Sequence, residues 1–324
     1  MTNTTTMTNP AIAAQGLRKS YRDKYGDKVV LDGIDLHVAE GTVFSLLGPN
    51  GAGKTTTVQI LSTLIGADGG DVTVAGHDIA RDPQAVRASI GVTGQYSAVD
   101  KLLTGEENLH LMADLHHLPR REGRQLTARL LEQFDLVEAA KKPASTYSGG
   151  MQRRLDLAMT LVGNPRIIFL DEPTTGLDPR SRRTMWQIIR DLVADGVTIF
   201  LTTQNLDEAD QLADRIALLD HGTLIAEGTP EELKRLIPGG HVSLRFADEP
   251  GVQSALSALG TGYITDDALT LQVPSDGSVR DLRHILTQLD DQAADVEDLS
   301  VHTPDLDDVF LTLTGNPKDK DTVR

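Results

Sequence analysis

Residues 48–56 have the types and spacing that bind a phosphate group. They read Gly48-Pro49-Asn50-Gly51-Ala52-Gly53-Lys54-Thr55-Thr56, in which four residues separate two glycines, and a lysine and a hydroxyl residue follow. The backbone N–H groups of such a turn point inward and form a nest for an anion, and a helix that starts there adds its positive end. Lys54 would then reach the β- and γ-phosphates of a nucleotide, and the Thr55 hydroxyl would bind Mg²⁺.

A pair of acids follows a second apolar stretch. Asp171 and Glu172 end the run Ile167-Ile168-Phe169-Leu170, whose continuous apolar character is typical of a buried strand. A carboxylate at the carboxyl end of a strand beside a phosphate loop can hold Mg²⁺, directly or through water, and the next acid can polarise the attacking water. In isolation such a pair is as often a solvated strand end; the phosphate loop favours the catalytic interpretation.

The segment Tyr147-Ser148-Gly149-Gly150-Met151-Gln152 offers a second place for a phosphate. Ser148 is a good helix N-cap, and two glycines let a ligand approach the backbone closely. An ordinary loop-to-helix turn is the more frequent meaning of Ser-Gly-Gly. Because the chain already has one cradle for a γ-phosphate, the segment suggests a site that is completed across a dimer.

Strands and helices alternate around these residues. A buried strand at 43–47 precedes the phosphate loop and a helix at 55–64 follows it. Further strands are predicted at 11–21, 29–38, 71–76, 90–93, 167–172, 197–202, 216–219 and 224–227. Apolar residues at helical spacing predict a mostly helical block at 106–140. This alternation implies a parallel sheet with helices on both faces.

A second, smaller domain is predicted at 241–315, beyond a boundary near Pro238-Gly239-Gly240. Its expected elements are a strand at 242–246, a helix at 252–259, a hairpin at 263–273 turning at Asp266-Asp267, a helix at 279–289 and a strand at 296–301. This β-α-β-β-α-β order predicts a ferredoxin-like α+β appendage. Residues 1–10 and 316–324 are expected to be tails that flank the two domains.

Composition excludes several classes of function. Lys and Arg number 31 against 47 Asp and Glu, a net charge of −16, which argues against a nucleic-acid binder and against unaided adhesion to an anionic membrane. With no cysteine, the chain has no disulfide, thiol catalysis or Cys-ligated metal. No signal peptide and no apolar run of membrane-spanning length is present, so we expect folding in the cytoplasm and any membrane work through a partner.

Taken together, these motifs resemble those of ATP-binding-cassette (ABC) ATPases. The phosphate loop, Gln95, Ser-Gly-Gly, Leu170-Asp171-Glu172-Pro173 and Gly176-Leu177-Asp178 stand in that family's order and spacing across residues 11–231. The resemblance implies an α/β fold, the P-loop NTPase fold of an ABC nucleotide-binding domain at 11–237. It has a parallel sheet core, an antiparallel β subdomain and a helical subdomain at about 97–160. It also implies ATP and Mg²⁺ as the bound groups.

The resemblance assigns roles at the nucleotide. Tyr21 would stack on adenine, with Tyr25 as a weaker candidate, and residues 48–56 would bind the phosphates. Thr55, Gln95 and Asp171 would surround Mg²⁺, and Gln95 would also sense the transmembrane subunit. Glu172 would be the general base, with Lys54 and Gln204 as further catalytic residues.

The resemblance also assigns roles across a dimer. The residues that would close over the γ-phosphate of ATP held by the facing protomer are Ser148, Gly149, Gly150 and Met151. Asp178 would communicate between the two protomers.

This sequence departs from the family's pattern at three positions. Tyr147 and Met151 stand where the signature usually has Leu and Gln, and Gln204 stands where the family has a switch histidine. Glutamine can donate a hydrogen bond to a γ-phosphate but cannot carry a proton or a positive charge. We expect Gln204 to keep the sensing contact with slower or differently pH-dependent hydrolysis; the alternative is that this subunit's ATPase is weak.

The exact residues of several motifs are similar to those of one branch of the family, the daunorubicin/doxorubicin-resistance type of drug-export ATPase. The similarity rests on Tyr-Ser-Gly-Gly-Met-Gln-Arg-Arg-Leu-Asp-Leu-Ala at 147–158, on Gln204, and on Thr-Pro-Asp-Leu-Asp-Asp-Val-Phe-Leu at 303–311. The last segment lies outside the nucleotide core. It is either a family-specific docking or coupling segment or an acidic amphipathic helix that packs on its own appendage.

These observations predict an ATPase subunit, peripheral on the cytoplasmic side of the cell membrane, that energises export of a drug or antibiotic. It would work as a homodimer with separate transmembrane permease subunits, contacted near Gln95 and 106–140. The alternatives are another exported cargo (lipid, polysaccharide or peptide) and a non-transporting regulatory nucleotide-binding module. The single phosphate loop and the acidic charge disfavour a cassette acting on ribosomes or DNA. The absence of an Asn-Lys-x-Asp motif disfavours a GTPase.

Overall fold

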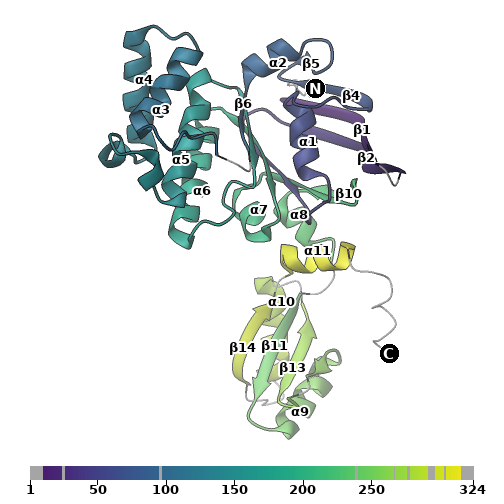
Figure 1. Cartoon of the computed structure of the whole chain (residues 1–324). Coiled ribbons are helices and arrows are strands. Elements are labelled where there is room, and N and C mark those ends of the chain that lie inside the picture. Colours follow the sequence, from purple (N-terminus) through teal and green to yellow (C-terminus); the bar gives the residue numbers. More distant parts are fainter. Residues whose placement is uncertain are drawn as a thin grey trace, which may run out of the picture. The chain divides into compact units, whose positions relative to one another are not determined.

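The computed structural model describes residues 10–23, 26–94, 97–237, 240–265, 267–275, 278–290, 296–302 and 304–314. The chain divides into two compact units, 1–230 and 231–324, so the division falls after Pro230 rather than near Pro238. Pro238 and Gly239 of the predicted boundary, and both predicted tails apart from Pro10, lie outside the described residues. Figure 1 follows the elements along the chain.

A six-stranded sheet forms the centre of the first unit, in the order β10-β9-β3-β8-β7-β6. The neighbouring strands from β9 to β6 are parallel, and β10 is an antiparallel edge. The strands are β3 (Val43–Leu47), β6 (Ile90–Thr93), β7 (Ile167–Asp171), β8 (Thr198–Thr203), β9 (Arg215–Asp220) and β10 (Thr223–Gly228). Every residue of β3, β7 and β8 is buried, because the sheet is covered on both faces.

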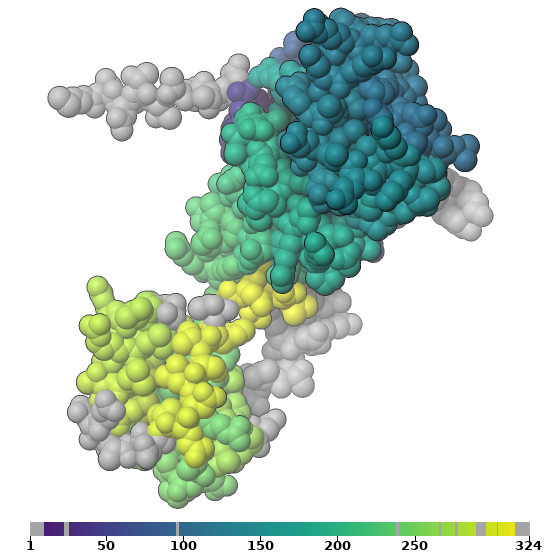
Figure 2. All heavy atoms as spheres, turned by 90° about the vertical axis from the view of Figure 1, so that its left-hand side faces the viewer, coloured from purple at the N-terminus to yellow at the C-terminus, as the bar shows by residue number. Residues whose placement is uncertain are grey.

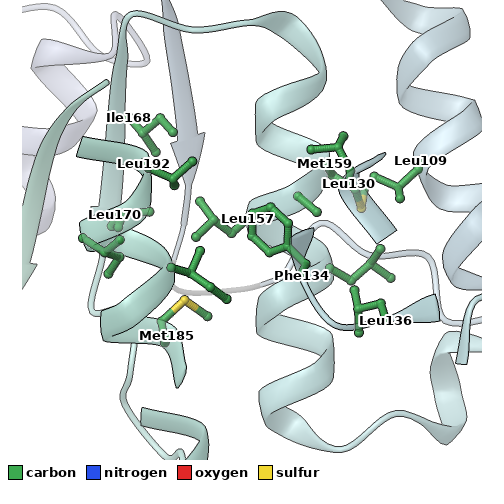
Figure 3. Packing of buried hydrophobic residues seen from close by; sticks show 14 of the residues in the cluster. Leu109, Leu130, Phe134, Leu136, Leu157, Met159, Ile168, Leu170, Met185 and Leu192 are labelled. Atoms are coloured by element: carbon green, nitrogen blue, oxygen red, sulfur yellow. The ribbon is translucent and has the colours of Figure 1, made fainter. Parts of the chain in front are cut away.

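Alternate side chains of β7 enter two different cores. Ile168 and Leu170 pack with the helices of one face, among them α5 (Gly149–Thr160) and α6 (Pro179–Ala194), as Figure 3 shows. Ile167 and Phe169 enter the second core with α1 (Lys54–Leu61). There, the ring centroids of Phe44 and Phe200 stand 5.5 Å apart. The period of two along the strand thus fixes the sheet between two layers.

An antiparallel sheet of order β2-β1-β4-β5 contributes to the second core. Its strands are β1 (Ile12–Asp23), β2 (Gly26–Val38), β4 (Gly69–Val74) and β5 (His77–Asp78), and α2 (Pro83–Ser89) follows. Asp82 caps α2, since its side chain accepts a hydrogen bond from the Ala85 amide. The parallel sheet and this antiparallel sheet were both expected from the family resemblance.

A helical block extends from the sheet, and Figures 1 and 2 show it as one lobe of the first unit. In the mostly helical block predicted at 106–140, the structure has α3 (Gly105–Leu115) and α4 (Arg120–Gln133). A capping box of Thr104 and Glu107 begins α3, and Pro119, which lacks an N–H, is the N-cap of α4. Farther along the chain, after β8, Asn205 is the N-cap of α7 (Leu206–Leu212).

The second unit contains the predicted β-α-β-β-α-β order. Its elements are β11 (His241–Phe246), α9 (Glu249–Leu259), β12 (Tyr263–Ile264), β13 (Thr270–Pro274), α10 (Val279–Asp290) and β14 (Val296–His302). The antiparallel sheet has the order β12-β13-β11-β14, and residues of both helices pack on it with Val242, Leu244 and Phe246. Helix α8 (Pro230–Lys234) lies at the division, and α11 (Leu306–Thr314) holds the acidic segment. Asp266 and Thr303 lie outside the described residues.

Tyr147, which replaces the family's usual Leu, is accommodated inside the helical block. Its ring is buried, and its hydroxyl donates a hydrogen bond to the Ala139 carbonyl at 2.7 Å. A Cβ atom at Gly105 would stand 2.2 Å from that hydroxyl oxygen, so the glycine leaves the space that the tyrosine needs. Burial raises the pKa of Tyr147, which therefore stays protonated as a donor.

We expect Tyr147→Phe to lower the free energy of unfolding by about 1 kcal/mol, because the Ala139 carbonyl loses its buried partner. The measurement is urea unfolding followed by circular dichroism. Tyr21→Phe makes the same chemical change on an exposed ring and should leave stability unchanged. An equal effect in both variants would contradict the assignment.

Candidate functional site

The phosphate loop joins β3 to α1 with its glycines in required conformations. Gly53 caps α1 with a left-handed φ of +114°, and a Cβ there would stand 2.6 Å from Leu31 Cδ2. The amide of Gly48 donates to the Thr203 carbonyl at 3.3 Å, which ties the start of the loop to the end of β8. Ala52 is buried, while Asn50, Gly51 and Thr55 are exposed at the opening and Pro49 and Thr56 are half-buried.

Lys54 is buried at the start of α1. Its Nζ donates to the carbonyls of Gly48 at 2.8 Å and Pro49 at 3.1 Å. It also stands 3.8 Å from a carboxylate oxygen of Glu172. Burial lowers the pKa of Lys54, and the neighbouring Glu172 and Asp171 carboxylates partly oppose that shift.

Asp171 and Thr55 face each other across the loop. The Thr55 hydroxyl donates to Asp171 Oδ1 at 3.4 Å, and the Thr202 hydroxyl donates to the same oxygen. Asp171 itself is buried at the end of β7. A hard divalent cation prefers oxygen ligands such as a hydroxyl and a carboxylate, so this pair of side chains suits Mg²⁺.

Glu172 follows β7 in an unusual backbone conformation. Its φ of +50° lies in the left-handed region, which costs energy for a residue with a side chain. The Glu172 amide donates to the Thr202 carbonyl at 3.0 Å, and Oε2 accepts from the Thr175 hydroxyl at 3.2 Å. The carboxylate is therefore fixed beside Lys54, at the same edge of the sheet as the phosphate loop.

Gln204 lies beside this edge of the parallel sheet, and Tyr21 lies on the antiparallel sheet. Gln204 is exposed one residue past β8, the strand between β3 and β7. Tyr21 is 43% exposed on β1, and Lys19 Nζ stands 5.6 Å from its ring centroid. Gln95 and Tyr25 lie outside the described residues.

The Ser-Gly-Gly segment begins α5 and packs on α6. Ser148 Oγ accepts from the Met151 amide at 3.3 Å, as predicted for an N-cap. A Cβ at Gly150 would stand 2.4 Å from Ser181 Oγ, whereas one at Gly149, which is exposed, would meet nothing closer than 3.9 Å. Within the described residues, no hydrogen bond or ion pair joins residues 148–151 to the phosphate loop of the same chain.

Asp178 caps α6 and meets Ser181 as well. Its Oδ1 accepts from the amides of Arg180 and Ser181, both at 3.0 Å, and its Oδ2 accepts from Ser181 Oγ at 2.6 Å. These hydrogen bonds hold the pKa of Asp178 below its ordinary value. Ser181 is thus in contact with the first turn of α5 and with Asp178.

Two charged residues near the site, the buried Glu208 and the half-buried Arg153, were not singled out from the sequence. Glu208 on α7 accepts from the Thr174 hydroxyl at 2.7 Å and from Trp186 Nε1 at 3.2 Å. Arg153 on α5 donates to backbone carbonyls at the end of β7. No local pattern marks either residue, because charged side chains on helices are usually exposed.

Comparisons with known proteins decide the family. Residues 31–175 match the family model described as ABC transporter. The chain is 49% identical to daunorubicin resistance ATP-binding protein DrrA2 of Streptomyces coeruleorubidus, over 94% of this chain and 95% of that protein. It is 48% identical to daunorubicin/doxorubicin resistance ATP-binding protein DrrA of Streptomyces peucetius, over 95% and 94%. The chain belongs to the ATP-binding subunits of ABC transporters. It is an ATP-binding ATPase of the daunorubicin/doxorubicin-resistance type.

Solved structures confirm the fold class. A dimeric ATP-binding cassette in a post-hydrolysis state, bound to ADP and Pi, matches with a TM-score of 0.62 and 27% identity, over 67% of this chain and 98% of that chain. The parallel core, antiparallel sheet and helical block of this ABC ATPase are therefore the family's arrangement. Among its described residues, no helix has both the length and the apolar character needed to cross a membrane.

Glu208 generates a pH prediction. Burial raises the pKa of Glu208 above its ordinary 4.5, against the hydrogen bonds of Thr174, Thr203 and Trp186 and the charge of Arg182. A raised pKa favours the protonated form in the fold, so this group's contribution to stability is present below pH 4.5 and is lost as the pH rises through the raised value. A glutamine would accept the same hydrogen bonds without that loss.

Relative to wild type, Glu208→Gln should therefore gain unfolding free energy as the pH rises from 4.5 to about pH 8. Urea unfolding at both pH values measures the difference. Glu132→Gln on the exposed side of α4 is the matched control and should track wild type at each pH. A pH-independent difference between wild type and Glu208→Gln would show that the buried carboxylate does not titrate in this way.

Proposed function

We propose that this ABC ATPase energises export of a drug or antibiotic through separate transmembrane permease subunits. The observation that supports this best is the extent of the likeness to the daunorubicin resistance protein, which covers 94% of this chain at 49% identity. The solved cassette covers only 67% of it. The likeness to the drug-resistance relative therefore includes most of residues 231–324, which a general cassette does not need.

At the nucleotide, residues 48–56 would wrap the phosphates and Tyr21 would stack on adenine. Thr55 and Asp171 would hold Mg²⁺, with Gln95 as a further ligand, and the bound ion would neutralise charge on the β- and γ-phosphates. The exposed Tyr21 ring and the Thr55–Asp171 distance of 3.4 Å support these roles. Gln204 would donate a hydrogen bond to the γ-phosphate from the end of β8.

Glu172 would be the general base toward the attacking water. In the structure, Lys54 satisfies two carbonyls of the loop and stands 3.8 Å from Glu172. An arriving γ-phosphate would attract the ammonium group more strongly than neutral carbonyls do. The carboxylate would then be free to accept a proton from water while Thr175 keeps it oriented.

The exposure of the signature residues supports their proposed role across a dimer. Ser148 and Gly149 are both exposed, and a Cβ at Gly149 would meet nothing closer than 3.9 Å, so a phosphate held by a second copy could reach the amino terminus of α5. Met151 would line the same contact and Asp178 would communicate between protomers through Ser181. The homodimer would sit at the cytoplasmic side of the cell membrane and contact its permease near Gln95 and residues 106–140.

The first test is ATP hydrolysis by the purified chain with Mg²⁺. Glu172→Gln should lower kcat by about 10²–10⁴-fold while ATP binding persists, since only proton transfer is removed. Lys54→Ala should lose ATP binding as well, because the phosphates lose their buried cation. Glu132→Gln serves as the exposed control.

The same Glu172→Gln protein should form an ATP-dependent dimer in light scattering, because hydrolysis no longer reopens it. Monomers alone, with ATP and Mg²⁺ present, would contradict the shared site. Tight ATP binding without turnover in the wild type would favour the regulatory alternative.

Gln204→His tests the altered switch position. A histidine titrates near pH 6.5, so the variant should hydrolyse ATP faster near neutral pH and show a new acidic limb in its pH–rate profile. The profile of kcat against pH for both proteins is the measurement. An unchanged rate and profile would mean that Gln204 does not limit hydrolysis.

A further inference from the structure

One guanidinium group, that of Arg153, holds the backbone of two chain segments, at Gly94 and at Asp171–Pro173. Nη1 donates to the Gly94 carbonyl at 2.7 Å, Nε donates to Pro173 at 3.0 Å, and Nη2 donates to Asp171 at 2.9 Å. Nη2 also reaches the Glu172 carbonyl at 3.4 Å. Only 11% of the Arg153 side chain is exposed. A planar group with five N–H donors can make these contacts at once, which a lysine cannot.

Its partner on α5, Asp156, holds the other side of the same segment. Asp156 Oδ1 accepts from the Ala98 amide at 3.0 Å, and Oδ2 stands 3.5 Å from Arg153 Nη1. Gly94 and Ala98 flank Gln95 and Tyr96 in the sequence. The pair of Arg153 and the buried Asp156 therefore anchors Gly94 and Ala98, on either side of Gln95 in the sequence, to the helix that begins with the signature.

The carbonyls that Arg153 binds are those at the end of β7, where the chain leaves the sheet. Glu172 has its left-handed φ of +50° there, a conformation that persists only where surrounding contacts enforce it. The Glu172 amide donates to the Thr202 carbonyl. Arg153 donates to the carbonyl of Glu172 and to those of the two residues beside it, Asp171 and Pro173. The direction of the Glu172 carboxylate thus depends on Arg153.

We propose that Arg153 is a positioning residue that fixes the backbone at Glu172 and links it to the Gly94–Ala98 segment and to the signature helix. A permease could displace Gly94, and a facing protomer could displace α5. Either displacement would be transmitted to the general base through the guanidinium group of Arg153. This inference rests on the proposed role of Glu172, which Arg153 influences without touching the nucleotide.

The neighbouring Arg154 supplies a matched control. Its side chain is 15% exposed, and its Nη1 donates to the Phe134 carbonyl at 3.0 Å and to Asp135 at 2.9 Å, both in the helical block. The two arginines share a helix, a charge and similar burial, but only Arg153 binds the backbone at Glu172. Loss of stability alone should affect both variants alike.

The test compares steady-state ATP hydrolysis by the full chain carrying Arg153→Gln, Arg153→Lys or Arg154→Gln. For Arg153→Gln we expect kcat to fall about ten-fold or more with KM for ATP within about two-fold, because the base is misplaced while the phosphate loop is intact. Arg153→Lys keeps the charge but loses the fork, so its kcat should lie between. Arg154→Gln should keep kcat within about two-fold.

Hydrogen exchange with ATP and Mg²⁺ gives a readout independent of turnover. Wild type and Arg154→Gln should gain protection together at the amides near Gly94–Ala98 and near Glu172, whereas Arg153→Gln should lose this common response. Equal kcat losses in Arg153→Gln and Arg154→Gln, or an unchanged kcat in Arg153→Gln, would overturn the proposal. If instead Glu172→Gln still hydrolyses ATP normally, the proposed function of Glu172 fails, whatever the arginine variants do.

Discussion

The register of three parallel strands is the constraint on which the site depends. Leu47 of β3 pairs with Thr203 of β8, and Asp171 of β7 pairs with Thr202. The three strands therefore end at one level, and the segments that follow them meet there: the phosphate loop, Glu172 and Gln204. A shift of one residue in either pairing would turn Asp171 and its neighbours toward the opposite face of the sheet. The two apolar cores prevent that shift, because alternate residues of β7 belong to different cores.

Buried charge is the second feature of this edge. The side chains of Lys54, Asp171, Arg153 and Glu208 are all largely withdrawn from water, and each makes a hydrogen bond with a neighbouring strand or loop. Desolvated charges that keep their partners form a rigid network, whereas a charge that loses its partner is strongly destabilised. The segment at the end of β7 belongs to both sets of contacts, because Asp171–Pro173 accepts hydrogen bonds from Arg153 and Thr174 donates one to Glu208. Its conformation is thus determined from several directions, which suits a segment that holds the proposed general base in a left-handed backbone conformation.

Much of this arrangement could be predicted from the sequence. The mostly apolar runs of β3 and β7 indicated a doubly covered parallel sheet, and the phosphate-binding pattern located the loop. The helical block at 106–140 was predicted from its apolar spacing, and within it Pro119 is the N-cap of α4. The sequence could not show which of Arg153 and Arg154 binds the backbone at Glu172. Neighbouring residues on a helix point about 100° apart, and sequence alone does not show which of them faces inward. Glu208 was missed because the groups that donate hydrogen bonds to it, on Thr174, Trp186 and Thr203, are distant from it or from one another in the sequence.

The two glycines of the signature show how a fold and a function can be separated. At Gly150 the reason for glycine lies within the chain, because a side chain would collide with Ser181 on α6. At Gly149 the chain offers ordinary contact distance and an exposed position, so folding alone does not require a glycine there. A residue that the fold leaves unconstrained, beside an exposed helix N-cap and the Asp178–Ser181 contact, is best explained by a constraint from outside the protomer. That reasoning supports the shared nucleotide site independently of the family to which the chain belongs.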